Sequence, residues 1–190
     1  FYQVIFLKLI TSNLVSDDTN NADDVFIRDI NAGTTRRISL DSAGIQAIGI
    51  SGHPAVSADG RYVVFSSSAN NLVFGDSNGQ SDVFLRDTEA ATTTRLSVSA
   101  LGVQADGGSV HPVITDDGRF VVFSSYARNL LGGDTNGSND IFLRDLLMGS
   151  LERVSIGSSG QQAIGSSATA SISSNGRYVM FSSGAANLVA

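Results

Sequence analysis

The sequence predicts an all-β protein built from small antiparallel sheets, one for each 58-residue repeat. An acidic segment that runs into an apolar stretch recurs at this constant interval, starting at Asp18, Asp76 and Asp134. A second segment, G-R-[YF]-V-[VM]-F-S-S, keeps the same interval and starts at Gly60, Gly118 and Gly176. No useful length of sequence has helical periodicity, and the apolar stretches are rich in β-branched and aromatic residues. A long fixed period therefore indicates a β-repeat architecture.

The second repeat shows the strands that we expect in each unit. Asp59-Gly60 predicts a tight hairpin turn, because glycine tolerates the positive φ that such turns require. A Gly-containing connector, residues 100–110, then leads to the next unit. The four expected strands cover about residues 54–57, 61–67, 82–87 and 92–99.

Burial of both sheet faces predicts how the units stack. Residues 62–65 and 83–85 are apolar at successive positions rather than alternating, which is typical of strands buried on both faces. Four-stranded sheets stacked around an axis form a β-propeller. The expected blades are residues 1–50 (partial), 51–108, 109–166 and 167–190 (partial).

The number of repeats does not by itself predict a closed ring. Propellers usually have about 4–8 blades, whereas this chain has about 3.3 units. The expectation is a segment of a longer propeller, or a protomer whose partial blades are completed by another copy. The first ten residues are apolar but interrupted by Lys8. They are too short for a membrane span, and their register predicts a diverged strand rather than a targeting peptide.

Composition narrows the classes of partner. The net charge is −6 with a pI near 4.6, which argues against nucleic-acid binding, because phosphate recognition needs clustered Lys and Arg. There are no cysteines, which excludes disulfides and sulfur-ligated metals. The expected ligand is a protein or a glycan.

The two motifs together resemble the TolB-like, WD-related propeller repeat of bacterial proteins. The matching stretches are S-A-D-G-R-Y-V-V-F-S at residues 57–66 and S-D-V-F-L-R-D at residues 81–87. Blades of that family look like S-x-D-G-[KR]-x-[IV]-x-F-x-S followed by D-[IV]-[FY]-x-x-D. The resemblance implies a propeller fold, and roles in periplasmic scaffolding, surface binding or the gating domains of peptidases. This chain differs by a longer loop between the second and third strands.

That longer loop offers hard oxygen ligands in the pattern D-x-N-x-x-x-D. Calcium takes 6–8 oxygens in flexible geometry, and Gly79 and Gly137 permit the sharp turn. The competing interpretation is an Asx-turn network without metal. As a hypothesis, each loop binds Ca²⁺ through side-chain and main-chain oxygens of Asp18, Asn20, Ala22 and Asp24; Asp76, Asn78, Gln80 and Asp82; or Asp134, Asn136, Ser138 and Asp140.

Other conspicuous residues have a structural interpretation. His53 and His111 are repeat-equivalent, and we expect them to be turn residues that pack on a neighbour. The repeated arginines and the aspartates that end the third strands are expected to form ion pairs or turn caps. Their positions are Arg37, Arg95 and Arg153, and Asp29, Asp87 and Asp145.

The predicted function is that of a non-enzymatic, calcium-binding scaffold, exported to the periplasm, the cell surface or the medium. Catalytic sites usually break repeat symmetry, whereas the charged features here obey it. One alternative is a propeller that belongs to a glycosidase or a peptidase. Another is a lectin-like sugar binder that uses calcium or the aromatic residues Tyr62, Phe120 and Tyr178, although core packing accounts better for these rings.

Overall fold

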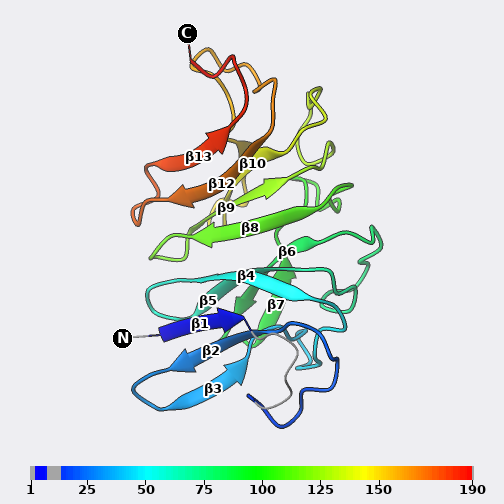
Figure 1. Cartoon of the computed structure of the whole chain (residues 1–190), viewed down its shortest axis with the longest axis vertical. Helices are drawn as coiled ribbons and strands as arrows, with labels where there is room; N and C mark the ends of the chain where they lie inside the picture. The colour runs from blue at the N-terminus through cyan, green and yellow to red at the C-terminus, as the bar shows by residue number, and fades with distance from the viewer. Residues whose placement is uncertain (1–2, 8–13, 190) are drawn as a thin grey trace.

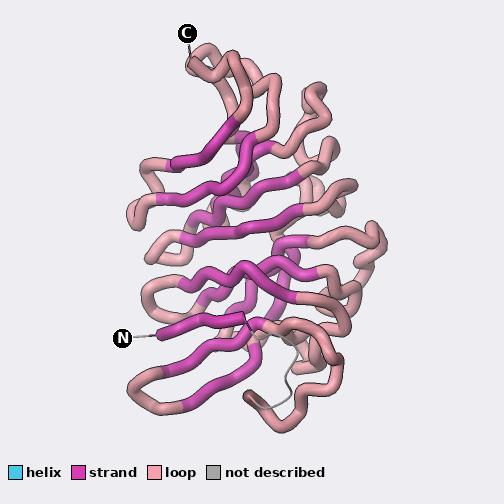
Figure 2. Tube along the Cα trace, in the orientation of Figure 1, coloured by secondary structure: helices cyan, strands magenta, loops and turns pink. Residues whose placement is uncertain are grey.

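The computed structural model describes residues 3–7 and 14–189, which form four antiparallel sheets stacked along the long axis of the molecule (Figures 1 and 2). We call the sheets blades 1 to 4. Blade 1 contains β1 (Gln3–Leu7), β2 (Val25–Asp29) and β3 (Thr34–Arg37). Blade 2 contains β4 (Ser51–Val56), β5 (Tyr62–Ser67), β6 (Asp82–Asp87) and β7 (Thr92–Arg95).

Blade 3 repeats blade 2 with β8 (Ser109–Ile114), β9 (Phe120–Ser125), β10 (Asp140–Asp145) and β11 (Leu151–Arg153). Blade 4 has two strands, β12 (Ser167–Ile172) and β13 (Val179–Ser183). The all-β prediction is confirmed. The described part of the chain contains no helix that is long and apolar enough to cross a membrane. β1 confirms a strand at residues 3–7, and the rest of the first ten residues lies outside the described ranges.

The two middle strands of blade 2 agree closely with the predicted ranges, whereas the outer two differ. β4 begins at Ser51, three residues before the predicted start, and a β-bulge between Gly52 and Ala55 interrupts its pairing with β5. β7 ends at Arg95 rather than at residue 99. The reason is local, since the Val98 N–H donates to the Leu96 carbonyl and turns the chain out of the sheet.

Antiparallel order places all long loops at one end of the stack and all tight turns at the other (Figure 1). The long-loop end comprises residues 14–24, 38–50, 68–81, 96–108, 126–139, 154–166 and 184–189. Strands β4, β8 and β12 are the first strands of their blades and lie side by side.

The hydrophobic core lies between blades rather than within one. Between blades 1 and 2, Val25 and Ile27 pack with Val63, Phe65 and Phe84, all at most 2% exposed. The equivalent core between blades 2 and 3 includes Val64, Val83, Val121, Phe123 and Phe142. Strands β5 and β6 therefore bury one set of side chains on each face, which confirms the expectation from their continuous apolar sequence.

Polar cross-links join the third strand of one blade to the connector that leaves the preceding blade. The buried Arg86 of β6 donates from Nη1 to the Asp41 carbonyl of the preceding connector, at 2.8 Å. Arg144 of β10 donates in the same way to the carbonyls of Leu96 and Val98. In the sequence these arginines stand directly before Asp87 and Asp145. Their guanidinium groups instead bind main-chain carbonyls of the preceding connector.

Candidate functional site

The acidic loop of blade 2 folds back so that its carboxylates surround the Arg95 guanidinium. Asp82 begins β6 and is fully buried, and Asp76 is almost so. Arg95 Nη2 lies 3.6 Å from Asp76 Oδ2, and its Nε lies 3.7 Å from Asp82 Oδ2. At these separations charge attraction persists, but Nε makes no hydrogen bond. The arginine is the cation of this loop.

Neutral side chains complete the hydrogen bonding of the two carboxylates. Gln104 Nε2 donates to Asp76 Oδ1 and Asp82 Oδ2, both at 2.8 Å. The Ser97 hydroxyl donates to Asp82 Oδ1 at 2.6 Å. Asn78 Nδ2 donates to the Ala105 carbonyl at 2.9 Å and, at 3.3 Å, to Asp82. The Gln80 N–H donates to Asn78 Oδ1, which forms the Asx turn of the competing interpretation.

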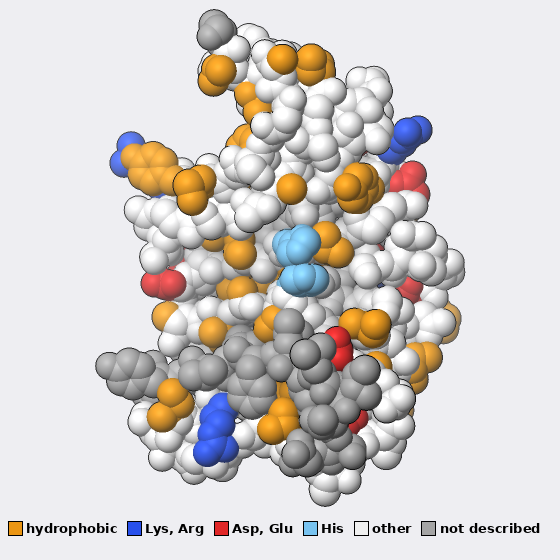
Figure 3. Space-filling model, in the orientation of Figure 1, with side chains coloured by type: hydrophobic (Ala, Val, Ile, Leu, Met, Phe, Trp, Pro, Cys, Tyr) orange, Lys and Arg blue, Asp and Glu red, His pale blue; other side chains and the backbone are white. Residues whose placement is uncertain are grey.

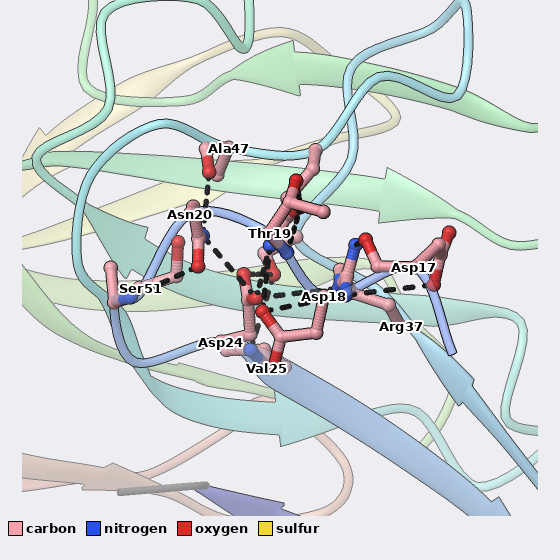
Figure 4. Close-up of polar contacts among 12 residues, drawn as sticks. Asp17, Asp18, Thr19, Asn20, Asp24, Val25, Arg37, Ala47 and Ser51 are labelled. Atoms are coloured by element: carbon pink, nitrogen blue, oxygen red, sulfur yellow. Dashed lines mark hydrogen bonds and ion pairs between the residues drawn. The ribbon is translucent and has the colours of Figure 1, made fainter. Parts of the chain in front are cut away.

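The first loop has the same construction (Figure 4). Arg37 Nε lies 3.3 Å from Asp24 Oδ2, and its Nη2 lies 3.7 Å from Asp18 Oδ1. Gln46 Nε2 donates to both carboxylates, at 3.0 and 2.9 Å. Asn20 accepts from the Ala22 N–H and donates to the Ala47 carbonyl. Blade 3 repeats these contacts with Asp134, Asn136, Ser138, Asp140, Arg153 and Gln162.

The structure thus brings the predicted ligand side chains together, but around an arginine. Both carboxylates of the second loop already face protein donors, so a calcium ion there would have to displace Arg95 and Gln104. Among residues 3–7 and 14–189 no group of three or more His, Cys, Asp and Glu side chains is arranged to hold a metal ion. Calcium binding is a hypothesis that no observation here tests, and it competes with the arrangement of the carboxylates around Arg95.

Sequence reasoning missed the roles of Gln104 and Ser97. Both recur in every repeat, as Gln46 and Gln162 and as Ser39 and Ser155. Their repetition was the available signal, but nothing in the spacing shows that a connector glutamine reaches a loop 28 residues earlier. The network fixes the connector onto the loop, and the Ser109 N–H then bonds to the Ser81 carbonyl. The acidic loop therefore positions the first strand of the next blade.

Burial raises the pKa of Asp82, and hydrogen bonds from Ser97 and Gln104, followed by the charge of Arg95, oppose this effect. The ionised form of this carboxyl therefore depends on its partners. A raised pKa in the folded state means that protonation of Asp82 favours folding. Its contribution to stability is present at low pH and is lost as the pH rises through the folded pKa.

Asp87 and Asp145 are turn caps and ion-pair partners, as expected, but the paired arginine directly precedes the second strand, whereas Asp29 caps its turn. Asp145 accepts the Leu147 N–H at 2.9 Å and the Met148 N–H at 3.2 Å. Arg119 contacts it at 2.7 Å. In blade 2, Arg61 pairs with Asp87 at 2.8 Å. This pair joins the second and third strands where the chain turns.

Replacing Arg119 by glutamine is expected to raise the pKa of Asp145 from about 2 toward its ordinary value of 3.8, because the Arg119 hydrogen bond is the largest cause of the depression. Since the folded pKa is lowered, Asp145 contributes stability above pH 3.8 that is lost as the pH falls through about 2. Carboxyl-carbon NMR titration measures this pKa. Glu152→Gln is the control and should leave it unchanged. An unchanged pKa in Arg119→Gln would assign the depression to the turn amides.

The two histidines lie inside strands rather than in turns. His53 and His111 occupy the bulges of β4 and β8 with φ of 51° and 54°, and their ring centroids are 4.1 Å apart, edge to face. Figure 3 shows the pair at the centre of the face formed by these strands. Burial, followed by the charge of His111, lowers the pKa of His53. Thr169 has the same φ of 51° in β12, so the bulge belongs to the repeat.

The strand aromatics serve contacts between blades where a following blade is present. The ring of Tyr62 covers Gly118, where an added Cβ would lie 2.5 Å from Cδ2. Phe120 covers Gly176 in the same way. Tyr178 is 61% exposed. Core packing therefore accounts for the first two rings.

Exposed apolar side chains gather at the long-loop end. Phe74 is fully exposed, and Ile48 is 63% exposed. The Ile48 N–H donates to Asn71 Oδ1 at 3.0 Å, so that loops of blades 1 and 2 lie together here. An open groove of about 350 Å³ beside Phe74 is lined by Asp41, Ser42, Ala43, Asn71, Leu72, Val73 and Thr93. Further exposed apolar residues at this end are Ile45, Ile50, Leu101, Val103, Tyr126, Ile156 and Ile164.

Comparison with known proteins identifies the fold. No family model and no curated protein sequence matches the chain. Among solved structures, TolB from Acinetobacter baumannii superimposes with a TM-score of 0.51 and 21% identity over 84% of this chain. The fold is that of a TolB-like β-propeller. This chain covers 31% of that TolB chain.

Two other matching structures are peptidases with longer chains. The tricorn protease matches 87% of this chain with a TM-score of 0.52 and 14% identity. A prolyl endopeptidase matches 85% with a TM-score of 0.51 and 16% identity. The chain covers 13% and 22% of these proteins, so it spans less than a third of each structure compared. At these identities the likeness shows the fold alone.

Proposed function

We propose that this TolB-like propeller is a binding scaffold that holds a protein partner at its long-loop end. The proposal rests on a difference in location between the charged and the exposed apolar side chains. The repeated charged residues are used inside the protein, where they fix loops and connect blades. Most of the large exposed apolar residues instead lie on loops of one end, among them Phe74 and Ile48.

The groove beside Phe74 suits an extended or amphipathic peptide segment. Phe74 supplies a large apolar contact surface at its edge, and aromatic anchors of this kind dominate many interfaces. The Asp41 and Ser42 side chains at the groove add polar groups that can orient a bound main chain. The net charge of −6 favours a basic or neutral partner over an acidic one.

An exported location, in the periplasm or at the cell surface, is part of the proposal and rests on the likeness to TolB. Attachment to a hydrolase is compatible with the fold, but no residue arrangement in the described chain favours it. A sugar site on the strand aromatics has less support, because Tyr62 and Phe120 already cover glycines of the next blade. Calcium binding is tested separately, together with Arg95, in the Discussion.

Panning a phage-displayed random peptide library tests the proposal. We expect enriched apolar or aromatic peptides whose affinity falls at least about tenfold in Phe74→Asp, because a charge replaces the exposed ring. Leu147→Asp is the matched control, since Leu147 is 74% exposed at the opposite, tight-turn end. It should bind these peptides as the wild type does. Equal binding by wild type and Phe74→Asp would contradict the proposed surface.

A further inference from the structure

A pocket of about 380 Å³ lies between blades 1 and 2. It is lined by β3 and the connector that follows it, and by the end of β6 and the turn after it. Three arginines and one aspartate line it, so the pocket is positively charged in a protein whose net charge is −6. Its volume is large enough for a small organic molecule.

Arg86 is the buried cation of this pocket and is 7% exposed. Its Nη1 donates to the Asp41 carbonyl at 2.8 Å and to Thr93 Oγ1 at 3.0 Å. Among the described residues no acceptor is bonded to its Nε or Nη2. A guanidinium group has five N–H donors, and a buried donor is costly to leave unpaired. Arg86 therefore has donors left for a ligand in the pocket.

Thr93 explains why these donors remain free. Its hydroxyl donates to the Leu40 carbonyl. In blade 3 the equivalent residue is Leu151, which has no hydroxyl, and there Arg144 Nη2 donates to the equivalent carbonyl, that of Val98. The threonine of blade 2 thus occupies the acceptor that the neighbouring arginine would otherwise bind.

Arg36 supplies a second guanidinium group to the same pocket. It is exposed, and no described carboxylate lies within ion-pair distance of it. The equivalent residues of the next two blades are Thr94 and Glu152, so this arginine departs from the repeat. Burial lowers the pKa of Arg86, the charge of Asp41 opposes this effect, and the charge of Arg36 adds to it. An anion bound to both guanidinium groups would relieve their repulsion.

The aspartate of the pocket already has a cation (Figure 4). Asp17 Oδ1 lies 3.6 Å from Arg37 Nη2, and the Asp17 carbonyl accepts from Arg37 Nη1. The Arg37 guanidinium also faces Asp24, at 3.3 Å from Nε. Of the three arginines, Arg36 and Arg86 are therefore the two that remain available to a ligand.

The equivalent space between blades 2 and 3 has a different lining. Thr94 stands there in place of Arg36. Leu146 stands in place of Thr88. Arg119 also lines this space, but it is already paired with an aspartate at 2.7 Å. The cationic pocket is thus specific to the junction of blades 1 and 2, and the second junction is an internal control.

We propose that the pocket between blades 1 and 2 binds a small organic anion, whose carboxylate or phosphate group bonds to Arg86 and Arg36. A guanidinium group suits both kinds of oxyanion, because its planar N–H donors match two oxygens at once. Ile38 and Leu40 offer apolar contacts for the rest of the ligand. The inference does not depend on the proposed peptide surface at the long-loop end.

Heteronuclear NMR titration with benzoate and phenyl phosphate, at low ionic strength, tests the proposal. We expect saturable shifts of the amide signals of residues 36–40 and 86–88, and none for the equivalent residues 94–98 and 144–146. The tighter of the two anions identifies the head group. Uncharged benzamide should bind at least about tenfold more weakly. No saturation by either anion up to about 10 mM, or equal affinity for benzamide, would overturn the proposal.

Two variants that copy the other blades test the two arginines. Arg36→Thr introduces the residue of position 94 and should weaken binding of the tighter anion at least about tenfold, with the fold intact because Arg36 is exposed. Thr93→Leu introduces the residue of position 151 and should also weaken it, since Arg86 can then bond to the Leu40 carbonyl. Arg128→Gln removes an exposed arginine of blade 3 and should bind as the wild type does. Undiminished binding by Arg36→Thr, or an equal loss in Arg128→Gln, would contradict the site.

Discussion

Replacing Arg95 by methionine is expected to lower the free energy of unfolding by about 3–5 kcal/mol, the usual cost of removing one partner of a buried ion pair. Asp82 would stay buried with its charge unpaired, and Asp76 would lose its cation. For a chain of this size the melting temperature should fall by on the order of 10 °C. Urea denaturation at pH 7 measures the change.

The loss of unfolding free energy in Arg95→Met should become smaller as the pH falls. Without Arg95 the pKa of Asp82 rises further, and protonation then removes the unpaired charge. Arg36→Met is the control, because Arg36 is exposed and makes no described ion pair. Its effect should stay within about 0.5 kcal/mol. Equal losses in Arg95→Met at pH 7 and pH 4 would contradict the role assigned to this guanidinium.

Calcium provides an independent check on the same loop. With Arg95 in place, millimolar calcium should leave the melting temperature of the wild type unchanged, since each carboxylate oxygen of Asp76 and Asp82 already faces a protein donor. A rise with calcium that EDTA reverses would support the calcium hypothesis instead. It would show that the ion displaces the arginine.

Replacing Phe123 by alanine is expected to cost about 3–5 kcal/mol, because its fully buried ring fills the space between blades 2 and 3. The ring stacks on Phe142 and belongs to the cluster that includes Val64 and Val83 of blade 2. Its removal leaves a cavity at the contact that holds the two blades together. Thermal and urea unfolding measure the loss.

Phe181→Ala is the matched comparison, since Phe181 is the repeat equivalent in blade 4 and is only partly buried. In a monomer it should cost clearly less than Phe123→Ala. Equal losses in a monomeric protein would contradict the burial difference between the two positions.

The sequence predicted the bounds of the strands closely where the apolar pattern was continuous. β5 and β6 matched their predicted ranges within a residue, because strands buried on both faces leave an uninterrupted signal. β4 and β7 were misplaced at their outer ends. A bulge at His53 and the turn at Leu96 decide those ends, and both depend on hydrogen bonds that no local pattern shows.

The sequence predicted only part of the chemistry of the acidic loops. The spacing of Asp76, Asn78 and Asp82 correctly indicated converging oxygens, and the Asx turn was one of the two interpretations. The cation could not be identified, because Arg95 and Gln104 come from β7 and the following connector. Acidic residues at ligand spacing look the same in sequence whether their counter-charge is a metal ion or an arginine side chain.

The sequence by itself determined the repeat and the all-β class, because a fixed period requires each unit to fold alike and stack on its neighbour. Only the tertiary structure decided the partners of the charges. Arg86 reaches carbonyls rather than Asp87, Asp87 pairs with Arg61, and Arg95 lies between two carboxylates. These pairings depend on which side chains come into contact when strands pair and blades pack. Separation along the sequence does not predict those contacts.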